Sequence, residues 1–232
     1  MVLYGVGVGP GDPDLVTIGA RRAIDEADAV FLPVSAVGRR GVAGDIFASL
    51  CGSNREAHEF WFPMTQDAEK RDREIKRQIE ELRGVWKEAH SVALPVIGDS
   101  VLFATASYLY DVWREICPGL ELRLLPGISA HSLASSVARE FIALGDERLA
   151  ILPGSADAEK LTESMMTSDC VALYKPSALG ENLTGLVEST GPWRKAVRVH
   201  RAGMSEQSVS VGNEAISPTK DYLSVLLLWR DR

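Results

Sequence analysis

The start of the chain constrains the fold most, because a short apolar segment runs directly into a glycine- and proline-rich loop. Residues 2–8 are mostly apolar and rich in valine, which is typical of a buried parallel strand. The loop at residues 9–13 ends this strand, and Asp12 is followed by a proline, as at the N-cap and first position of a helix. Apolar residues between positions 15 and 27, Ile18 among them, recur on one face of the predicted helix. This strand, loop and helix predict an α/β fold.

The same alternation continues along the chain. Further strands are predicted at residues 29–33, 92–97, 122–125, 149–152, 170–174, 196–201 and 222–229. Helices are predicted at residues 45–50, 67–89, 105–116, 132–139, 158–166 and 179–189. Strands become denser and connections shorter toward the end. We therefore predict two α/β domains, residues 1–126 with a mostly parallel sheet and residues 127–232 with a mixed sheet.

Composition excludes several classes of function. The net charge is −7 and no lysine- or arginine-rich block offsets it, so neither nucleic acid nor an anionic membrane is an expected partner. No apolar run is long enough to span a bilayer. The three cysteines are far apart and the four histidines show no paired spacing, so we predict no metal site. The cysteine pattern favours a reducing, cytoplasmic location.

The first loop does not have the spacing of a dinucleotide site. The pattern G-x-G-x-x-G would need a glycine at Pro10 if it began at Gly5, or at Asp12 if it began at Gly7. The prolines of this loop also lack the amide donors that a pyrophosphate would use. A nicotinamide-dependent oxidoreductase is thus disfavoured, although a plain strand-to-helix turn remains open.

Small residues follow several predicted strands in the same way. Such loops occupy residues 7–13, 97–102 and 126–130, and a fourth strand ends at residues 173–175. Ligands of open α/β sheets bind at the carboxyl ends of strands, and glycines there let a backbone approach a ligand closely. The recurrence predicts a ligand site built from these loops.

At these residues the chain resembles the tetrapyrrole (corrin/porphyrin) methylases. The stretch Gly-Val-Gly-Pro-Gly-Asp-Pro at residues 7–13, Gly-Asp at residues 98–99 and Pro-Gly-Ile-Ser-Ala at residues 126–130 resemble the motifs of that family. Three further stretches are similar to the branch that methylates C-20 of precorrin-2 or cobalt-factor II. They are Phe-Pro-Met-Thr at residues 62–65, Gly-Asp-Glu-Arg-Leu at residues 145–149 and Asp-Tyr-Leu-Ser-Val at residues 221–225. The chain departs from the family pattern at Ser100, where a proline is usual, at residues 103–105 and at Asp221.

The resemblance implies a two-domain α/β fold of the class III methyltransferases, with S-adenosylmethionine in a cleft between the domains. It implies a cytoplasmic homodimer that acts in cobalamin biosynthesis, and S-adenosylhomocysteine as the product. Trp61, Phe62 and Trp113 are candidates for either the dimer interface or the core. The cofactor contacts that it implies are Gly9, Pro10, Gly98, Asp99, Leu102, Ser129, Ala130, Tyr174 and Ala202.

Several roles follow from the chemistry of this reaction. Methyl transfer from a sulfonium is an in-line displacement with a neutral leaving group, so alignment dominates and we nominate no catalytic acid or base. Asp99 is a candidate partner for the cofactor ammonium or the centre of an Asx-turn. Gly11 is expected beside the substrate. Arg39 and Arg40 are candidates for binding its carboxylates, although a solvated loop is equally open.

Other hypotheses remain open at this point. The nearest is methylation of another ring position or another tetrapyrrole. A nicotinamide-dependent oxidoreductase and a non-catalytic module that binds a nucleotide-like ligand belong to different classes. The sequence does not decide whether the substrate contains cobalt.

Overall fold

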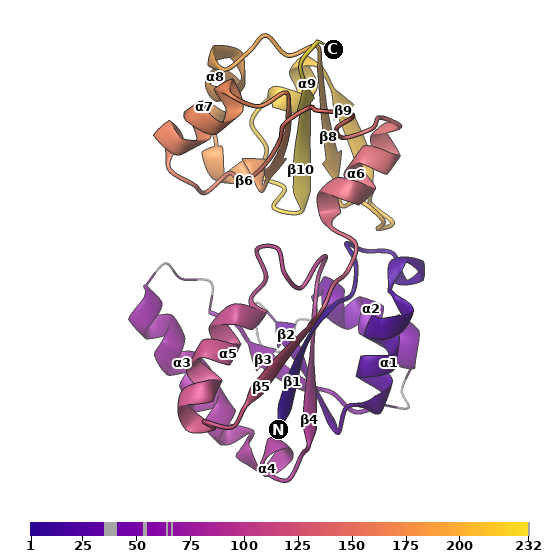
Figure 1. The fold of residues 1–232 in the computed structure, drawn as a ribbon, viewed down its shortest axis with the longest axis vertical. Coiled ribbons are helices and arrows are strands. Elements are labelled where there is room, and N and C mark those ends of the chain that lie inside the picture. The colour runs from indigo at the N-terminus through magenta and orange to yellow at the C-terminus, as the bar shows by residue number, and fades with distance from the viewer. Residues whose placement is uncertain (35–40, 53–54, 64, 66, 232) are drawn as a thin grey trace. The chain divides into compact units, whose positions relative to one another are not determined.

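The computed structural model describes residues 1–34, 41–52, 55–63, 65 and 67–231. The chain divides into two compact units, Met1–Ser129 and Ala130–Arg232, so the division follows Ser129 where the sequence suggested Pro126. Each unit carries one five-stranded sheet, with order β3-β2-β4-β1-β5 in the first and β6-β7-β10-β8-β9 in the second (Figure 1). Both sheets are flanked by helices, and the predicted α/β fold is confirmed.

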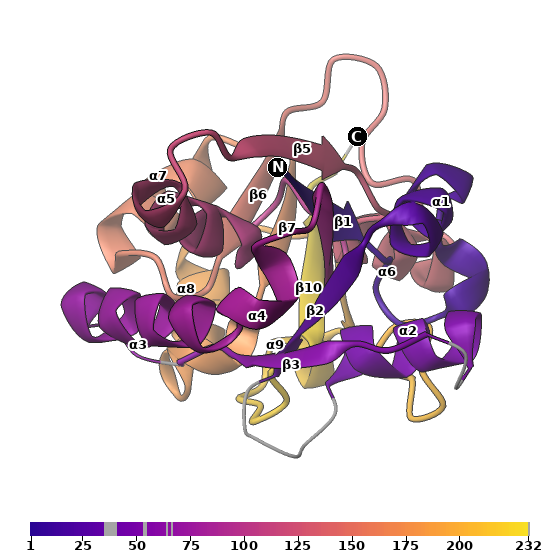
Figure 2. The ribbon, with the colours of Figure 1, turned by 90° about the horizontal axis from the view of Figure 1, so that it is seen from below.

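All strands of the N-terminal sheet are parallel. They are β1 (Val2–Gly7), β2 (Ala29–Val34), β3 (His58–Trp61), β4 (Ser91–Val96) and β5 (Glu121–Leu125). The helices are α1 (Ile18–Glu26), α2 (Val42–Cys51), α3 (Ala68–Glu81), α4 (Arg83–Trp86) and α5 (Ala106–Ile116), with a 3-10 turn η1 (Pro13–Leu15). Helices α1 and α2 cover one face of the sheet, and α3, α4 and α5 cover the other (Figure 2).

The core on the α5 face is aromatic. Trp113 is fully buried and stacks on Phe31, with ring centroids 5.5 Å apart. Trp86 meets Trp113 edge-on at 5.4 Å. Phe62 is 8% exposed and packs in the same cluster. Trp113 and Phe62 therefore belong to the core of this unit.

The first helix differs from its prediction at its start. Asp12 does act as a cap, but of the short turn η1, where its side chain accepts from the Asp14 amide at 2.9 Å. Helix α1 begins only at Ile18, and Thr17 caps it by accepting from the Ala20 amide. Because α1 is a separate helix that begins after η1, Ile18 lies off the buried face and is 80% exposed. The buried face consists of Ala20, Ala23 and Ile24.

The C-terminal sheet is mixed, because β6 and β7 are parallel whereas β10 pairs antiparallel with β7 and β8. Its strands are β6 (Leu149–Pro153), β7 (Cys170–Tyr174), β8 (Lys195–His200), β9 (Ser208–Val211) and β10 (Ser224–Trp229). Its helices are α6 (Ala130–Ala138), α7 (Ala158–Met166), α8 (Asn182–Ser189) and α9 (Asn213–Ile216), with a 3-10 turn η2 (Pro176–Leu179). One face packs on α6, and the other packs on α7, α8 and α9.

No helix in the described part of the chain is long and apolar enough to cross a membrane.

Candidate functional site

The N-terminal sheet reverses its winding between β1 and β4. These strands are neighbours, yet α1 follows β1 on one face and α5 follows β4 on the opposite face. The connecting loops therefore leave the sheet in opposite directions at their carboxyl ends. That edge is the usual ligand-binding position of an open α/β sheet.

The two loops at this point are tied together by their backbones. The Gly9 amide donates to the Gly98 carbonyl at 3.1 Å, and the Gly98 amide donates back to the Gly9 carbonyl at 2.7 Å. Both glycines have φ of +75°, a conformation that side chains with a Cβ rarely adopt. Two of the predicted cofactor contacts thus form one reciprocal bridge.

The loop after β5 joins the same junction without room for side chains. A Cβ on Gly7 would lie 2.5 Å from the Gly127 nitrogen, and one on Gly127 would lie 2.3 Å from the Gly98 carbonyl oxygen. A Cβ on Gly98 would meet nothing within 4 Å. We call Gly7, Gly9, Gly98 and Gly127 the glycine junction. It is closed between the loops and open beside Gly98.

Asp99 holds the loop after β5 as well as its own turn. One carboxylate oxygen accepts from the Val101 amide at 3.2 Å and from the Gly127 amide at 3.3 Å. The other accepts from the Ser129 hydroxyl at 3.3 Å. The Asx-turn expected for Asp99 is therefore present, and its carboxylate also positions Ser129.

Ser100 is one of the positions at which the chain departs from the family pattern. Its side chain is buried, and its hydroxyl donates to the Leu125 carbonyl at 2.7 Å. The hydroxyl thus ties the loop after β4 to the end of β5. Sequence reasoning treated this position only as a missing proline and did not foresee the bond.

The predicted contact residues of this unit also differ in burial. Gly9 and Pro10 are buried, whereas Gly11 and Leu102 are half-buried in the loops after β1 and β4. Arg39 and Arg40, the predicted substrate-binding residues, lie outside the described residues.

Three predicted residues of the C-terminal unit belong to a single apolar cluster. Tyr174 ends β7, Ala202 follows β8 and Ala130 begins α6, and all pack in the same cluster. The Tyr174 hydroxyl lies 2.8 Å from His131 Nδ1 and accepts from the His131 amide at 3.2 Å. The structure therefore brings Ala130, Tyr174 and Ala202 together, and Tyr174 positions the start of α6.

Two basic residues beside this cluster have unusual backbones. Lys175 follows Tyr174 with φ of +52°, and Arg201 precedes Ala202 with φ of +47°. Their amides donate to neighbouring carbonyls of one segment, Ser224 at 3.2 Å and Leu223 at 2.7 Å. Left-handed conformations at non-glycine residues are strained and concentrate at functional sites. No sequence signal marks these conformations, since neither residue type favours them.

A charged group lies at the end of β8. The buried Arg198 donates through Nε to His200 Nε2 at 3.0 Å, and Asp221 lies 3.6 Å from His200 Nδ1. Burial lowers the pKa of His200, the Arg198 charge lowers it further, and Asp221 and Glu214 oppose the shift. The net effect favours the neutral form of the imidazole.

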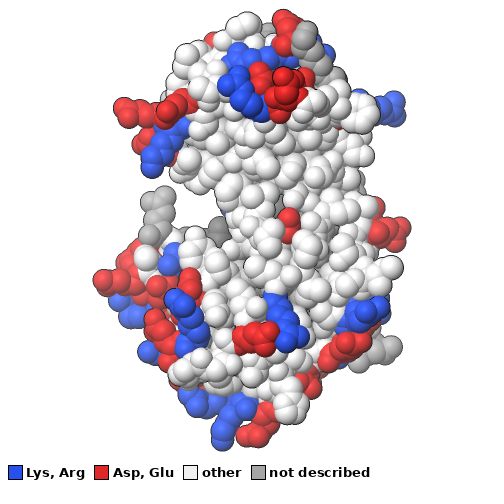
Figure 3. Space-filling view, viewed as in Figure 1, with Lys and Arg blue, Asp and Glu red and all other residues white. Residues whose placement is uncertain are grey.

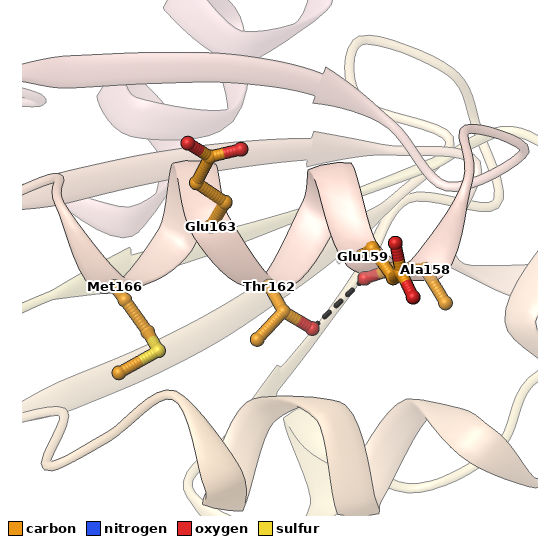
Figure 4. Close-up of a pocket in the computed structure, with 5 residues that line it drawn as sticks. All are labelled: Ala158, Glu159, Thr162, Glu163 and Met166. Carbon is orange, nitrogen blue, oxygen red and sulfur yellow. Dashed lines mark hydrogen bonds between the residues drawn. The ribbon is translucent and has the colours of Figure 1, made fainter.

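Two surface hollows are lined by residues other than those of the glycine junction. One, of about 490 Å³, follows the exposed side of α7 beside Met166 and the carboxylates of Glu159 and Glu163 (Figure 4). The other, of about 360 Å³, lies beside α2 and contains Arg55. Arg55 donates to the carbonyls of Asp25 and Ala27, at the end of α1. Neither hollow carries the small-residue loops of the candidate site.

On the face shown in Figure 3, positively and negatively charged side chains are intermingled in mixed groups, and large areas between them carry no charged side chain. Within the described ranges, no cluster of three histidine, cysteine or acidic side chains could hold a metal ion.

Comparison with known proteins defines the class to which this fold and these loops belong. The sequence profile described as "Tetrapyrrole (Corrin/Porphyrin) Methylases" matches residues 2–216. The chain belongs to this family.

Individual relatives and a solved structure are similar to this chain over nearly its full length. A Methanocaldococcus jannaschii protein named "Probable cobalt-precorrin-2 C(20)-methyltransferase" is 32% identical, covering 98% of this chain and 96% of that protein. The precorrin-2 C(20)-methyltransferase of Sinorhizobium sp. is 27% identical, covering 99% and 96%. Among solved structures, the uroporphyrin-III C-methyltransferase of Thermus thermophilus, complexed with S-adenosylhomocysteine, superposes with a TM-score of 0.69. It is 16% identical and covers 98% of this chain and 91% of its own, so it supports the fold.

Proposed function

We propose that this chain is an S-adenosylmethionine-dependent C-methyltransferase that methylates C-20 of precorrin-2 or cobalt-factor II in cobalamin biosynthesis. The observation that carries the proposal is the glycine junction at the point where the sheet winding reverses. Similarity over nearly the whole chain to two proteins named for C-20 methylation supports the substrate and ring position. Membership of the methylase family disfavours both another cofactor class and a purely non-catalytic module.

The residues present fit the cofactor. Backbone loops closed by Gly7 and Gly127 but open at Gly98 let a ligand approach main-chain atoms directly,. Gly9, Pro10, Gly98 and Leu102 would then line its methionine part. Asp99 and Ser129 offer a carboxylate and a hydroxyl for its ammonium group,. Ala130, Tyr174 and Ala202, which pack in one apolar cluster, would contact the adenine.

The bound cofactor supplies a methyl group on a positively charged sulfur. The task of the chain is then to bind, orient and exclude water, since the leaving thioether is neutral and requires no proton. The tied loops after β1, β4 and β5 keep main-chain groups fixed, which limits the loss of entropy that alignment otherwise demands. Gly11, next to buried Pro10, is proposed to border the substrate. No side chain is assigned as a general acid or base.

We also propose a cytoplasmic homodimer. The family resemblance supports the dimer, and three cysteines that are all free thiols support a reducing compartment,. Light scattering of the purified chain is expected to give twice the mass of 25.2 kDa, whereas a monomer mass would contradict the dimer.

Calorimetry tests the cofactor assignment. S-adenosylhomocysteine is expected to bind with a dissociation constant on the order of micromolar, and NAD is expected not to bind. Affinity for NAD alone would overturn the proposal. Turnover with precorrin-2 compared with cobalt-factor II then identifies which substrate the enzyme prefers.

A further inference from the structure

A stacked arginine stands at the carboxyl edge of the N-terminal sheet. Helix α3 follows the parallel strand β3 and α5 follows β4, so both helices begin at the edge where the glycine junction lies. The two helices also pack against each other (Figure 1). Arg71 lies in the first turn of α3 and Tyr108 in the first turn of α5.

The Arg71 side chain is held in place by an aromatic ring. Its guanidinium lies over the Tyr108 ring, with the central carbon 4.1 Å from the ring centroid. The Tyr108 ring in turn contacts buried Phe62, at a centroid distance of 6.0 Å. The Arg71 side chain is only 17% exposed. Stacking of this kind fixes the plane of the guanidinium fork before any ligand binds.

Most of the donors of Arg71 are not used within the described chain. Its Nε donates to Asp72 at 2.9 Å, and the structure records no partner for its two terminal nitrogens among the residues it describes. Arg77, on the same helix, is bound by Glu74 and Glu81. An arginine oriented in this way is suited to bidentate binding of a carboxylate.

Exposed apolar side chains lie in the segment that leads into α5 and in the first turn of that helix. Val101 is 59% exposed, Phe103 is 46% exposed and Tyr108 is 43% exposed. Exposed apolar groups gathered on one segment are typical of a binding surface. A flat macrocycle with carboxylates on its periphery has the complementary chemistry, because its face is apolar and its edge is anionic.

We infer that Arg71 binds a peripheral carboxylate of the tetrapyrrole substrate, while Val101 and Phe103 face the macrocycle. Tyr108 is a positioning residue that holds the guanidinium. This inference rests on the proposed function and adds a substrate contact to it.

The test compares the steady-state kinetics of three variants, Arg71→Met, Arg71→Lys and Tyr108→Leu, with those of the control Arg73→Met. S-adenosylmethionine is kept saturating and the concentration of the tetrapyrrole is varied. Arg73 lies on the same helix with a side chain that is 68% exposed, which makes it a matched control. Arg71→Met is expected to raise KM roughly 10- to 100-fold, as loss of a charge-assisted hydrogen bond does, with a smaller change in kcat. Arg71→Lys and Tyr108→Leu should raise KM less, and Arg73→Met should leave it unchanged.

Two further readouts separate binding from folding. Each variant should bind S-adenosylhomocysteine as the wild type does. Among the described residues, Arg71 interacts with Asp72 and Tyr108 and not with the loops of the glycine junction. The KM of the wild type should rise with ionic strength more steeply than that of Arg71→Met, since only the wild type has this charge pair.

The outcomes distinguish this inference from the proposed function. If the wild type methylates the tetrapyrrole and Arg71→Met has the KM of Arg73→Met, the Arg71 assignment is wrong and the function stands. Equal losses of substrate and S-adenosylhomocysteine affinity in Arg71→Met would also overturn the assignment. If the wild type binds S-adenosylhomocysteine but methylates no tetrapyrrole, the proposed function fails and the inference falls with it.

Discussion

At the scale of single residues, the glycine junction makes the sharpest prediction. Gly127→Ala would force a Cβ to within 2.3 Å of the Gly98 carbonyl oxygen and 2.7 Å of the Gly7 carbonyl carbon. These are backbone atoms, so the loops must separate. We expect urea denaturation to show a loss of about 1–3 kcal/mol in the free energy of unfolding, together with weaker S-adenosylhomocysteine binding in calorimetry. The control Gly119→Ala meets nothing within 4 Å. Equal stability and affinity in the two variants would contradict the account of the junction.

Ser100 gives a second prediction at this scale. Ser100→Ala removes the buried hydroxyl that donates to the Leu125 carbonyl at 2.7 Å, and should lower the free energy of unfolding by about 1–2 kcal/mol. Ser107→Ala is the matched control, because the Ser107 hydroxyl bonds to the Ala104 carbonyl at an exposed position. Urea midpoints that shift equally in the two variants would show that the Ser100 bond contributes nothing specific.

His200 predicts a pH dependence of stability. Burial and Arg198 lower its pKa below the ordinary value of 6.5, so the unfolded chain binds a proton more readily than the folded chain. The contribution of neutral His200 to stability is therefore complete above pH 6.5 and is lost as the pH falls from 6.5 toward the lower pKa of the folded state,. The urea midpoint should fall between about pH 7.5 and about pH 5.5, and less so in His200→Gln. An identical fall in both proteins would rule out His200 as the source.

The residues of the site were predictable to different degrees. Glycines after predicted strands could be assigned to the site from the sequence, because a glycine lets the backbone approach a ligand closely. In the structure, Gly9 and Gly98 pair in one bridge. The bond of Ser100 and the left-handed Lys175 and Arg201 depend on contacts between segments distant in sequence. The stacking of Arg71 on Tyr108 likewise requires two helices to meet, which no local pattern encodes.

At the scale of elements, the contacting tryptophans of α4 and α5, Trp86 and Trp113, should respond differently to the same substitution. The Trp86 Nε1 donates to the Ile79 carbonyl at 2.7 Å, whereas the Trp113 Nε1 is buried without a partner among the described residues. Trp→Phe removes a similar volume at both sites, but only at Trp86 does it break a hydrogen bond. We expect Trp86→Phe to cost about 1 kcal/mol more than Trp113→Phe, measured by urea unfolding. A larger loss in Trp113→Phe would contradict this.

The predictability of elements followed the strength of their pattern. The strand at residues 170–174 and the helix at 158–166 were predicted with the bounds of β7 and α7, because no glycine or proline interrupts either segment. Strands β3 and β9 were not foreseen, since both are four-residue edge strands and carry too little apolar alternation. The predicted helix at 67–89 is divided at Leu82 into α3 and α4, where Trp86 turns inward onto Trp113.

At the scale of the whole molecule, family and fold were both readable from the sequence, because glycine-containing loops follow strands at residues 7–13, 97–102 and 126–130 and further family-like stretches extend to residue 225. Membership of the tetrapyrrole methylases confirms that reading. The order β3-β2-β4-β1-β5 required the structure, since it depends on which strands pair. That order places the loops after β1 and β4 side by side.

Transfer of a methyl group to C-20 can be observed by locating the transferred carbon in the product. The purified chain would be incubated with S-adenosylmethionine labelled with ¹³C in its methyl group and with either precorrin-2 or cobalt-factor II. We expect one labelled methyl group in the product, assigned by NMR to C-20, and an equimolar amount of S-adenosylhomocysteine. Label at another ring carbon, or none with either substrate, would contradict this expectation.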